Sequence, residues 1–169
     1  CKQIFDINNE YKLNLYNGDS LELNTEKEWG IKKFDVIMGN PPYNKGGIRS
    51  HTGKHLGEKN ETIWPEFIEK SINMLKKNGF LVFINPLSWL KKSHSMHNKL
   101  LEKHVIWLKL WDNIKSLATI NGKIPLSLYI LYNHKNSNKN KTEIISEIQS
   151  KKIYTNSNIH LDVTKSIPL

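Results

Sequence analysis

The stretch FDVIMGNPPYN, residues 34–44, constrains the fold more than any other part of the sequence. Its first half is a short apolar run of the kind found in strands that are buried on both faces of a parallel sheet. Gly39 lets the backbone leave the sheet, and two consecutive prolines end the ladder because neither has a backbone N–H. The segment therefore predicts a strand that presents Asn40 and Tyr43 at its carboxyl end, where open α/β sheets bind their ligands.

Apolar runs alternate with helical patterns along the rest of the chain. A helix is predicted to begin at Thr62 and to stop at Asn78 and Gly79, and a shorter one is predicted around 94–103. Strands separated by helices imply right-handed crossovers, so the predicted class is α/β with a mostly parallel sheet and flanking helices. The other predicted strands are 11–16, 80–85, 105–111 and 127–133.

The composition limits which kinds of partner and which cellular compartment we expect for the chain. The chain has 169 residues and a formal charge of +9, with basic residues spread along its length, which favours a polyanionic partner and nucleic acid first. Its single cysteine, Cys1, excludes an internal disulfide and favours a reducing, cytoplasmic compartment. No run reaches the length of a membrane span, so we expect no membrane segment and no signal peptide.

The sequence Asn-Pro-Pro-Tyr after an apolar strand resembles the catalytic motif of amino-group methyltransferases that use S-adenosylmethionine. Four segments occur in the order of the adenine-N6 DNA methyltransferases, especially the gamma-class and type IIG restriction-modification enzymes: YNGDSLEL, FDVIMGNPPYN, LKKNG and GFLVFINPLSWL. The resemblance runs from about residue 11 to residue 133. It implies a partial Rossmann-like methyltransferase fold, S-adenosylmethionine as cofactor and double-stranded DNA as partner, in a protein of bacterial, phage or viral origin.

The residue types of the motif suit the chemistry. An adenine N6 amino group is a poor nucleophile because its lone pair is delocalised, and two acceptors on its hydrogens would favour a more tetrahedral, reactive nitrogen. Asn40 offers a side-chain carbonyl and Pro41 a main-chain carbonyl, and fixing both in advance is electrostatic catalysis. Tyr43 offers a face on which a base flipped out of the duplex can stack. The resemblance implies these roles, with Pro42 completing the motif; a plain strand terminator and turn is the alternative.

A second candidate site lies in the segment GDSL. The resemblance implies that the Asp19 carboxylate accepts a hydrogen bond from the adenine amino group of the cofactor. Ser20, Leu21 and Asn40 are the other predicted cofactor contacts. An aspartate that caps a turn is the alternative interpretation.

The loop after Tyr43 is a candidate for DNA contact. Lys45, Arg49, Lys54 and Lys59 are predicted to bind phosphates, since lysine and arginine supply most nonspecific affinity for DNA. A solvated loop is the alternative. The histidines of this loop lie far from any cysteine, so no metal site is predicted.

The segment NPLSWLKKSH is the other candidate for DNA contact. Trp89, Lys91 and Lys92 follow the carboxyl end of a predicted strand and would line the path of a flipped nucleotide. A core tryptophan followed by solvated lysines is the alternative.

One part of the resemblance is missing. It implies a glycine-rich cofactor loop after a first strand, and no G-x-G segment occurs in the chain. We therefore predict that residues 1–133 form the C-terminal part of a methyltransferase catalytic domain, and that these 169 residues alone bind S-adenosylmethionine weakly or not at all. Residues 134–141 are predicted to be a basic linker, and 142–169 the start of a target-recognition module.

Several functions remain open beside methylation of DNA adenine. Protein-glutamine methyltransferases that act on release factors carry the same motif, and RNA adenine methyltransferases carry related ones. The chain would also suit a truncated, non-catalytic module that binds nucleic acid. The basic loop, the PLSWL segment and the trailing module favour DNA; no nuclease motif and no G-x-S-x-G elbow is present.

Overall fold

The computed structural model describes residues 8, 10, 11, 13–45, 61–111, 125–137 and 140–146, and the backbone of 161–163. The chain divides into two units, Cys1–Lys33 and Phe34–Leu169, and each is described by itself. None of the described helices is long and apolar enough to cross a membrane.

The first unit contains a short helix, α2 (Thr25–Trp29), that is capped at both ends. The side chain of Asn24 accepts a hydrogen bond from the backbone N–H of Lys27, and Gly30 ends the helix with a φ of 70°. Glycine adopts this left-handed backbone without steric cost, so the local sequence specifies both ends of the helix.

The strand predicted at 11–16 is wrong for the residues that the structure describes there. Residues 13–16 have no regular structure, and Tyr11 and Leu15 are 69% and 53% exposed. A strand is stable when a neighbour pairs with its backbone N–H and C=O groups, and the described part of this unit offers no strand to pair with. Apolar alternation alone therefore did not produce a strand here.

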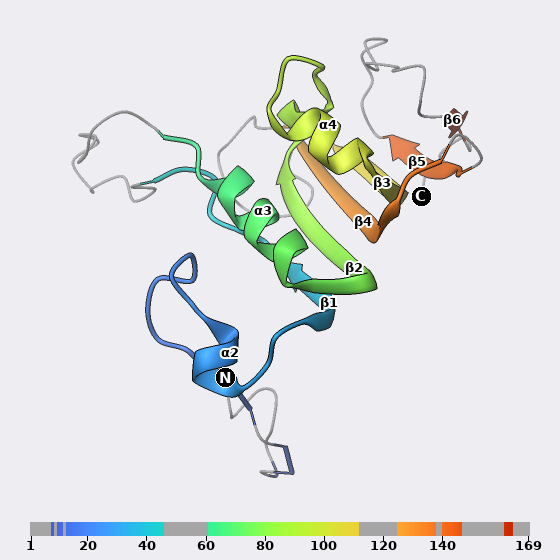
Figure 1. Ribbon diagram of the computed structural model, residues 1–169. Helices are drawn as coiled ribbons and strands as arrows, with labels where there is room; N and C mark the ends of the chain where they lie inside the picture. The colour runs from blue at the N-terminus through green and yellow to red at the C-terminus, as the bar shows by residue number, and fades with distance from the viewer. Residues whose placement is uncertain are drawn as a thin grey trace, which may run out of the picture. The chain divides into compact units, whose positions relative to one another are not determined.

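The second unit is built on one sheet with the strand order β1-β2-β4-β3-β5-β6 (Figure 1). The pairings of β1 with β2, β3 with β5 and β5 with β6 are parallel, whereas β4 is antiparallel to both of its neighbours. All described strands except β4 therefore point the same way, which confirms the predicted α/β class with a mostly parallel sheet. The strands are β1 (Phe34–Gly39), β2 (Leu75–Pro86), β3 (Lys103–Trp111), β4 (Leu126–Lys135), β5 (Thr142–Ser146) and β6 (Leu161–Val163).

The burial of β1 differs from the prediction. Val36 and Met38 are 50% and 73% exposed, so this strand is not buried on both faces. Among the described strands β1 pairs only with β2, and the described helices α3 and α4 lie on one face of the sheet (Figure 1). An apolar run reports which side chains prefer burial, but the layers placed around the strand decide whether they achieve it.

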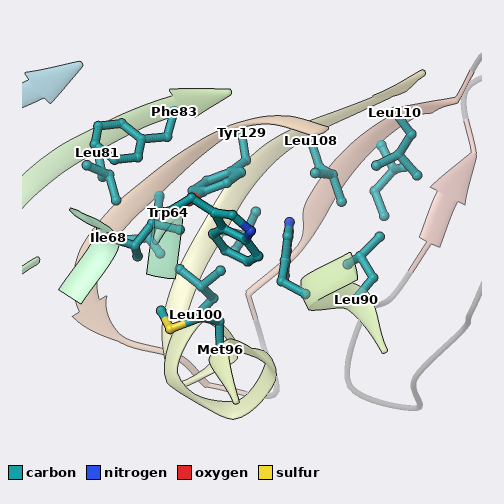
Figure 2. Packing of buried hydrophobic residues seen from close by; sticks show 14 of the residues in the cluster. Trp64, Ile68, Leu81, Phe83, Leu90, Met96, Leu100, Leu108, Leu110 and Tyr129 are labelled. Atoms are coloured by element: carbon teal, nitrogen blue, oxygen red, sulfur yellow. The ribbon is translucent and has the colours of Figure 1, made fainter. Parts of the chain in front are cut away.

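Helices α3 (Trp64–Met74) and α4 (Met96–Leu101) cover that face, and a 3₁₀ turn, η1 (Leu87–Leu90), follows β2. An ion pair between Glu69 and Lys99 joins the two helices. Their apolar faces meet the sheet in one buried cluster (Figure 2). At its centre, 0–1% exposed, are Trp64, Ile68, Leu81, Trp89, Met96, Leu100, Leu108, Tyr129 and Leu131.

Helix α3 ends earlier than its local signals predict. It stops at Met74, and Leu75 already pairs with Phe34 as the first residue of β2. The ammonium group of Lys76 lies 2.9 Å from the carboxylate of Asp35, and a Cβ on Gly79 would lie 2.9 Å from the Asp35 carbonyl oxygen. Pairing with β1 therefore ends the helix before the Lys-Lys-Asn-Gly pattern is reached. Because Gly79 has no side chain, the backbone of β2 can approach the Asp35 carbonyl closely. Nor is Thr62 the cap: it bridges Asn44, and Ile63 precedes the helix without a side-chain hydrogen bond.

The predicted linker is shorter than 134–141. His134 and Lys135 complete β4, and the backbone N–H of Asn136 donates to the carbonyl of Glu102 over 2.8 Å. Strand β5 then joins the same sheet beside β3. The described strands after residue 141 thus extend the same sheet, and a target-recognition module in 142–169 stays a prediction.

Candidate active site

Asn40 lies immediately after β1, at the carboxyl end of a strand that runs parallel to β2. Its side chain is exposed and makes no hydrogen bond to another described residue. The last residue of β1, Gly39, pairs with Phe83, and a Cβ on Gly39 would lie 3.4 Å from the Phe83 ring. Pairing with β2 therefore fixes the start of the motif while the Asn40 amide remains available to a ligand.

Two neighbouring prolines hold the chain as it leaves the sheet. Pro41 is buried and Pro42 is exposed. Each proline fixes its own φ, and neither requires a hydrogen-bond acceptor for a backbone N–H. The motif can thus leave the ladder without an unsatisfied donor, and burial of one ring anchors it.

Tyr43 is half-buried and packs against both apolar clusters of the second unit. Beside the main core it reaches the small cluster of Trp111 and Leu126, against which Ile84 and Leu128 also pack. Burial raises the pKa of the Tyr43 phenol, so the hydroxyl is neutral at physiological pH. The ring is therefore supported by apolar contacts on one side and remains partly open to solvent.

The backbone after Tyr43 is tied to the start of α3. The N–H of Ile63 donates to the carbonyl of Tyr43 over 3.1 Å, and the N–H of Lys45 donates to the carbonyl of Glu61 over 2.8 Å. Between these bonds Asn44 and Thr62 form an antiparallel bridge. Residues 43–45 and 61–63 are thus joined by backbone hydrogen bonds directly beside the motif.

Asp19 lies in the other unit, in an exposed turn. One oxygen of its carboxylate accepts a hydrogen bond from the N–H of Leu21 over 2.8 Å, and its carbonyl accepts one from the N–H of Glu22 over 3.0 Å. Ser20 is exposed and Leu21 is half-buried. This is the turn-capping geometry of the alternative interpretation, and the contact of these residues with a cofactor stays a prediction.

The predicted DNA contacts of the NPLSWLKKSH segment separate into two groups. Lys91 and Lys92 are exposed in the turn after η1, as a phosphate contact requires. Trp89 is 0% exposed, and its Nε1–H donates to the Ser127 hydroxyl over 2.9 Å. The prediction that Trp89 lines a nucleotide path is therefore wrong: its ring belongs to the core, as the alternative held.

Among the loop lysines, Lys45 is exposed and its ammonium lies 3.6 Å from the carboxylate of Glu61. An exposed pair of this kind is weak, so Lys45 stays a candidate phosphate contact. The predicted contacts Arg49, Lys54 and Lys59 lie outside the described residues. Within the described ranges no cluster of His, Cys, Asp and Glu side chains would hold a metal ion.

Sequence reasoning missed two ring contacts of the second unit. His94 stacks on Trp64 with ring centroids 5.0 Å apart and an interplanar angle of 18°. The ammonium of Lys109 lies 5.0 Å from the ring centre of Trp111, which supports Tyr43. No local pattern signals the His94–Trp64 contact, because the two residues lie far apart in the chain, whereas Lys109 and Trp111 are two residues apart on β3 and so share one face of the strand.

The sheet with its reversed strand β4 and an Asn-Pro-Pro-Tyr motif at a strand's carboxyl end define a class, the α/β methyltransferases. A solved type I restriction-modification methyltransferase subunit from Streptococcus thermophilus has the same fold, with a TM-score of 0.52 and 20% identity over 77% of this chain and 29% of that chain.

The particular family follows from the sequence match. The family described as Eco57I restriction-modification methylase matches residues 2–116, more than half of the chain, so the chain belongs to this family. A type II methyltransferase of Thermus thermophilus is 38% identical over 71 residues, 34% of this chain and 17% of that protein. An uncharacterized adenine-specific methylase of Mycoplasma pneumoniae is 31% identical over 87 residues, 52% of this chain and 19% of that protein. The chain thus spans less than a third of the length of each of these three proteins.

Proposed function

We propose that the protein to which this chain belongs transfers a methyl group from S-adenosylmethionine to the N6 amino group of a flipped adenine in DNA, within a restriction-modification system. Membership of the restriction-modification methylase family supports the reaction class, and the adenine-specific relatives support the base. The observation that carries the proposal is the exposed Asn40 at the end of β1, three residues before a half-buried Tyr43 that is anchored on both ring and backbone.

Asn40 and Pro41 would activate the nucleophile. Their carbonyl oxygens would accept the two hydrogens of the adenine amino group and turn its lone pair toward the methyl donor. The nitrogen would then form its bond to the methyl carbon as the carbon–sulfur bond of the donor breaks, and the surplus proton would pass to water. Because one acceptor is exposed and the other belongs to a proline-fixed backbone, little reorganisation is needed when the base arrives.

Tyr43 would hold the flipped base. Its ring is partly open, and the apolar cluster behind it restrains ring movement. Stacking on such a ring contributes about 1–3 kcal/mol per base. The exposed Lys45, Lys91 and Lys92, together with the formal charge of +9, would supply phosphate contacts, and Arg49 and Lys54 would extend them.

The cofactor site is only partly supplied by this chain. S-adenosylmethionine, when bound, would supply an electrophilic methyl group on a sulfonium sulfur. The exposed Asp19 turn leaves one carboxylate oxygen outside its Leu21 hydrogen bond, which fits a contact to the adenine amino group of the cofactor. Ser20, Leu21 and Asn40 would complete the contacts from this chain, and a glycine-rich loop would have to come from elsewhere in the protein. We propose a cytoplasmic location, where such an enzyme meets cellular DNA.

A substrate panel tests this proposal. The full-length protein is assayed for methyl transfer to duplex DNA, to RNA and to a release factor with its target glutamine, and DNA from expressing cells is mapped for modified adenines by long-read sequencing. We expect transfer to duplex DNA and modified adenines in one sequence context. Transfer only to the glutamine protein, or only to RNA, would replace the DNA proposal.

A further inference from the structure

Trp64 lies at the junction between the catalytic motif and the core. It is the first residue of α3, is 1% exposed and belongs to the buried cluster in Figure 2. The residue before it, Ile63, donates its N–H to the carbonyl of Tyr43. The position of the Trp64 ring is therefore coupled through one peptide unit to the backbone of Tyr43.

His94 joins a second segment to the same ring. The imidazole of His94 stacks on Trp64, and the backbone N–H of His94 donates to the carbonyl of Lys91 over 2.9 Å. The N–H of Lys91 in turn donates to the carbonyl of Ser88 in η1 over 3.1 Å. The exposed turn of Lys91 and Lys92 is thus held by η1 at one end and by the Trp64–His94 stack at the other.

The hydrogen bonds of His94 define its protonation state. Its Nδ1 accepts a bond from the N–H of Met96 over 3.2 Å, so the proton of the neutral ring is on Nε2. Burial is the main cause that lowers the pKa of His94, and electrostatic interactions with His97 and Lys91 lower it further, so the ring is neutral at physiological pH. The stack is therefore an aromatic contact between uncharged rings rather than a cation–π pair.

The surrounding core is held without His94. His97 is 3% exposed and its Nδ1 lies 3.1 Å from the carbonyl oxygen of Trp89, to which it donates. Trp89 is bonded to Ser127, and the Ser127 hydroxyl donates to the carbonyl of Asn85 over 3.1 Å. These bonds fix η1 and the start of α4 onto the sheet. Removing the His94 ring should consequently detach the lysine turn from Trp64, while the backbone hydrogen bonds within the turn and the core stay in place.

We propose that His94, stacked on Trp64, is a positioning residue that holds the Lys91–Lys92 turn in a fixed place relative to Tyr43, so that the turn binds DNA phosphates while Tyr43 receives the target base. This inference rests on the proposed function. The stack is the contact through which the DNA-facing turn and the base-stacking residue share one anchor, Trp64.

The test uses the full-length protein and four variants: His94→Ala, which removes the stack; His94→Phe, which keeps a flat ring; Lys91→Ala/Lys92→Ala; and the triple variant that adds His94→Ala to the lysine pair. For each, kcat and KM for duplex DNA are measured, together with the dependence of DNA binding on salt concentration. Thermal unfolding reports whether the variants fold.

For His94→Ala we expect KM for DNA to rise about tenfold and kcat to change by less than about twofold, because lost phosphate contacts weaken binding rather than chemistry. The slope of log K against log salt should fall by about one to two, as for the lysine pair. His94→Phe should restore KM to within about twofold of wild type. In the lysine-free background, His94→Ala should have no further effect on KM, because its action passes through those lysines.

Other outcomes would overturn the inference. An unchanged salt slope in His94→Ala, or an equal rise in KM with and without the lysines, would show that His94 does not act through the turn. If His94→Ala fails to fold, His94→Phe decides: a KM like that of the lysine pair would contradict positioning by the stack. A wild-type enzyme that methylates no DNA would instead remove the proposed function itself, which distinguishes the two failures.

Discussion

The chain carries two motif-bearing segments, around Asp19 and around Asn40, and they differ in how firmly the described structure supports them. Asn40 follows a strand paired with β2, and Tyr43 is fixed by apolar packing and by the Ile63 hydrogen bond. Asp19 lies in an exposed turn, in which its carboxylate accepts a hydrogen bond from the N–H of Leu21, two residues away. The acceptor oxygens that we propose for catalysis are thus held in place by this chain alone, whereas the carboxylate that we propose for cofactor binding relies on a local turn.

The largest effect is expected from a substitution in the better supported segment, around Asn40. Asn40→Ala should lower kcat of the full-length enzyme by about 10²–10³-fold, because a preorganised acceptor of an amino hydrogen is lost in the transition state. Methyl incorporation into duplex DNA measures it. Asn44→Ala is the matched control, since Asn44 is an exposed neighbour paired through its backbone. Equal activity of the two variants would remove Asn40 from catalysis.

The next effect concerns the ring of Tyr43. Tyr43→Ala should weaken binding of a site with a fluorescent adenine analogue at the target base by about 5–150-fold, the equivalent of 1–3 kcal/mol of stacking. Tyr43→Phe should stay within about twofold of wild type, because the aromatic ring is retained and the hydroxyl that is lost is neutral. A Phe variant as weak as the Ala variant would mean that the hydroxyl, and not the ring face, binds the base.

The proposed role of the Asp19 segment can be tested through the binding of the cofactor. In the full-length enzyme, Asp19→Ala should raise KM for S-adenosylmethionine about tenfold with a smaller change in kcat, since a hydrogen bond to a charged acceptor is lost. Glu22→Ala, an exposed acidic neighbour that enters the turn through its N–H, is the control. By calorimetry, the 169-residue chain alone should bind the cofactor weakly or not at all. Micromolar binding by this chain would show that the Asp19 side is complete without other segments.

The smallest expected effect is a pH dependence of the folding stability, which arises from His94. Because the pKa of His94 is lowered in the folded chain, the unfolded chain binds more protons as pH falls through the usual histidine value of about 6.5. The stability that neutral His94 contributes is therefore present above that pH and is lost below it. Thermal unfolding between pH 7.5 and 5.5 should show a larger loss for wild type than for His94→Phe. Parallel losses in the two proteins would contradict this.

Much of the fold was predictable because strand and turn signals are local. The strand before Asn40, its termination at two prolines and the α/β class all followed from short patterns. The end of α3 did not, because pairing of Leu75 with Phe34 outweighed the Lys-Lys-Asn-Gly pattern. The strand at 11–16 also failed, since a strand needs a partner that its own sequence does not specify.

For the candidate site, too, some features follow from the sequence and others only from the tertiary structure. The sequence by itself determined which groups are present: an amide and a carbonyl beside two prolines, a nearby aromatic ring and an excess of positive charge. Only the tertiary structure decided that Trp89 is buried while Lys91 is exposed, and that Trp64 touches His94. Residue type and spacing fix chemistry and local geometry, but burial and contacts between distant segments depend on how the helices and strands pack.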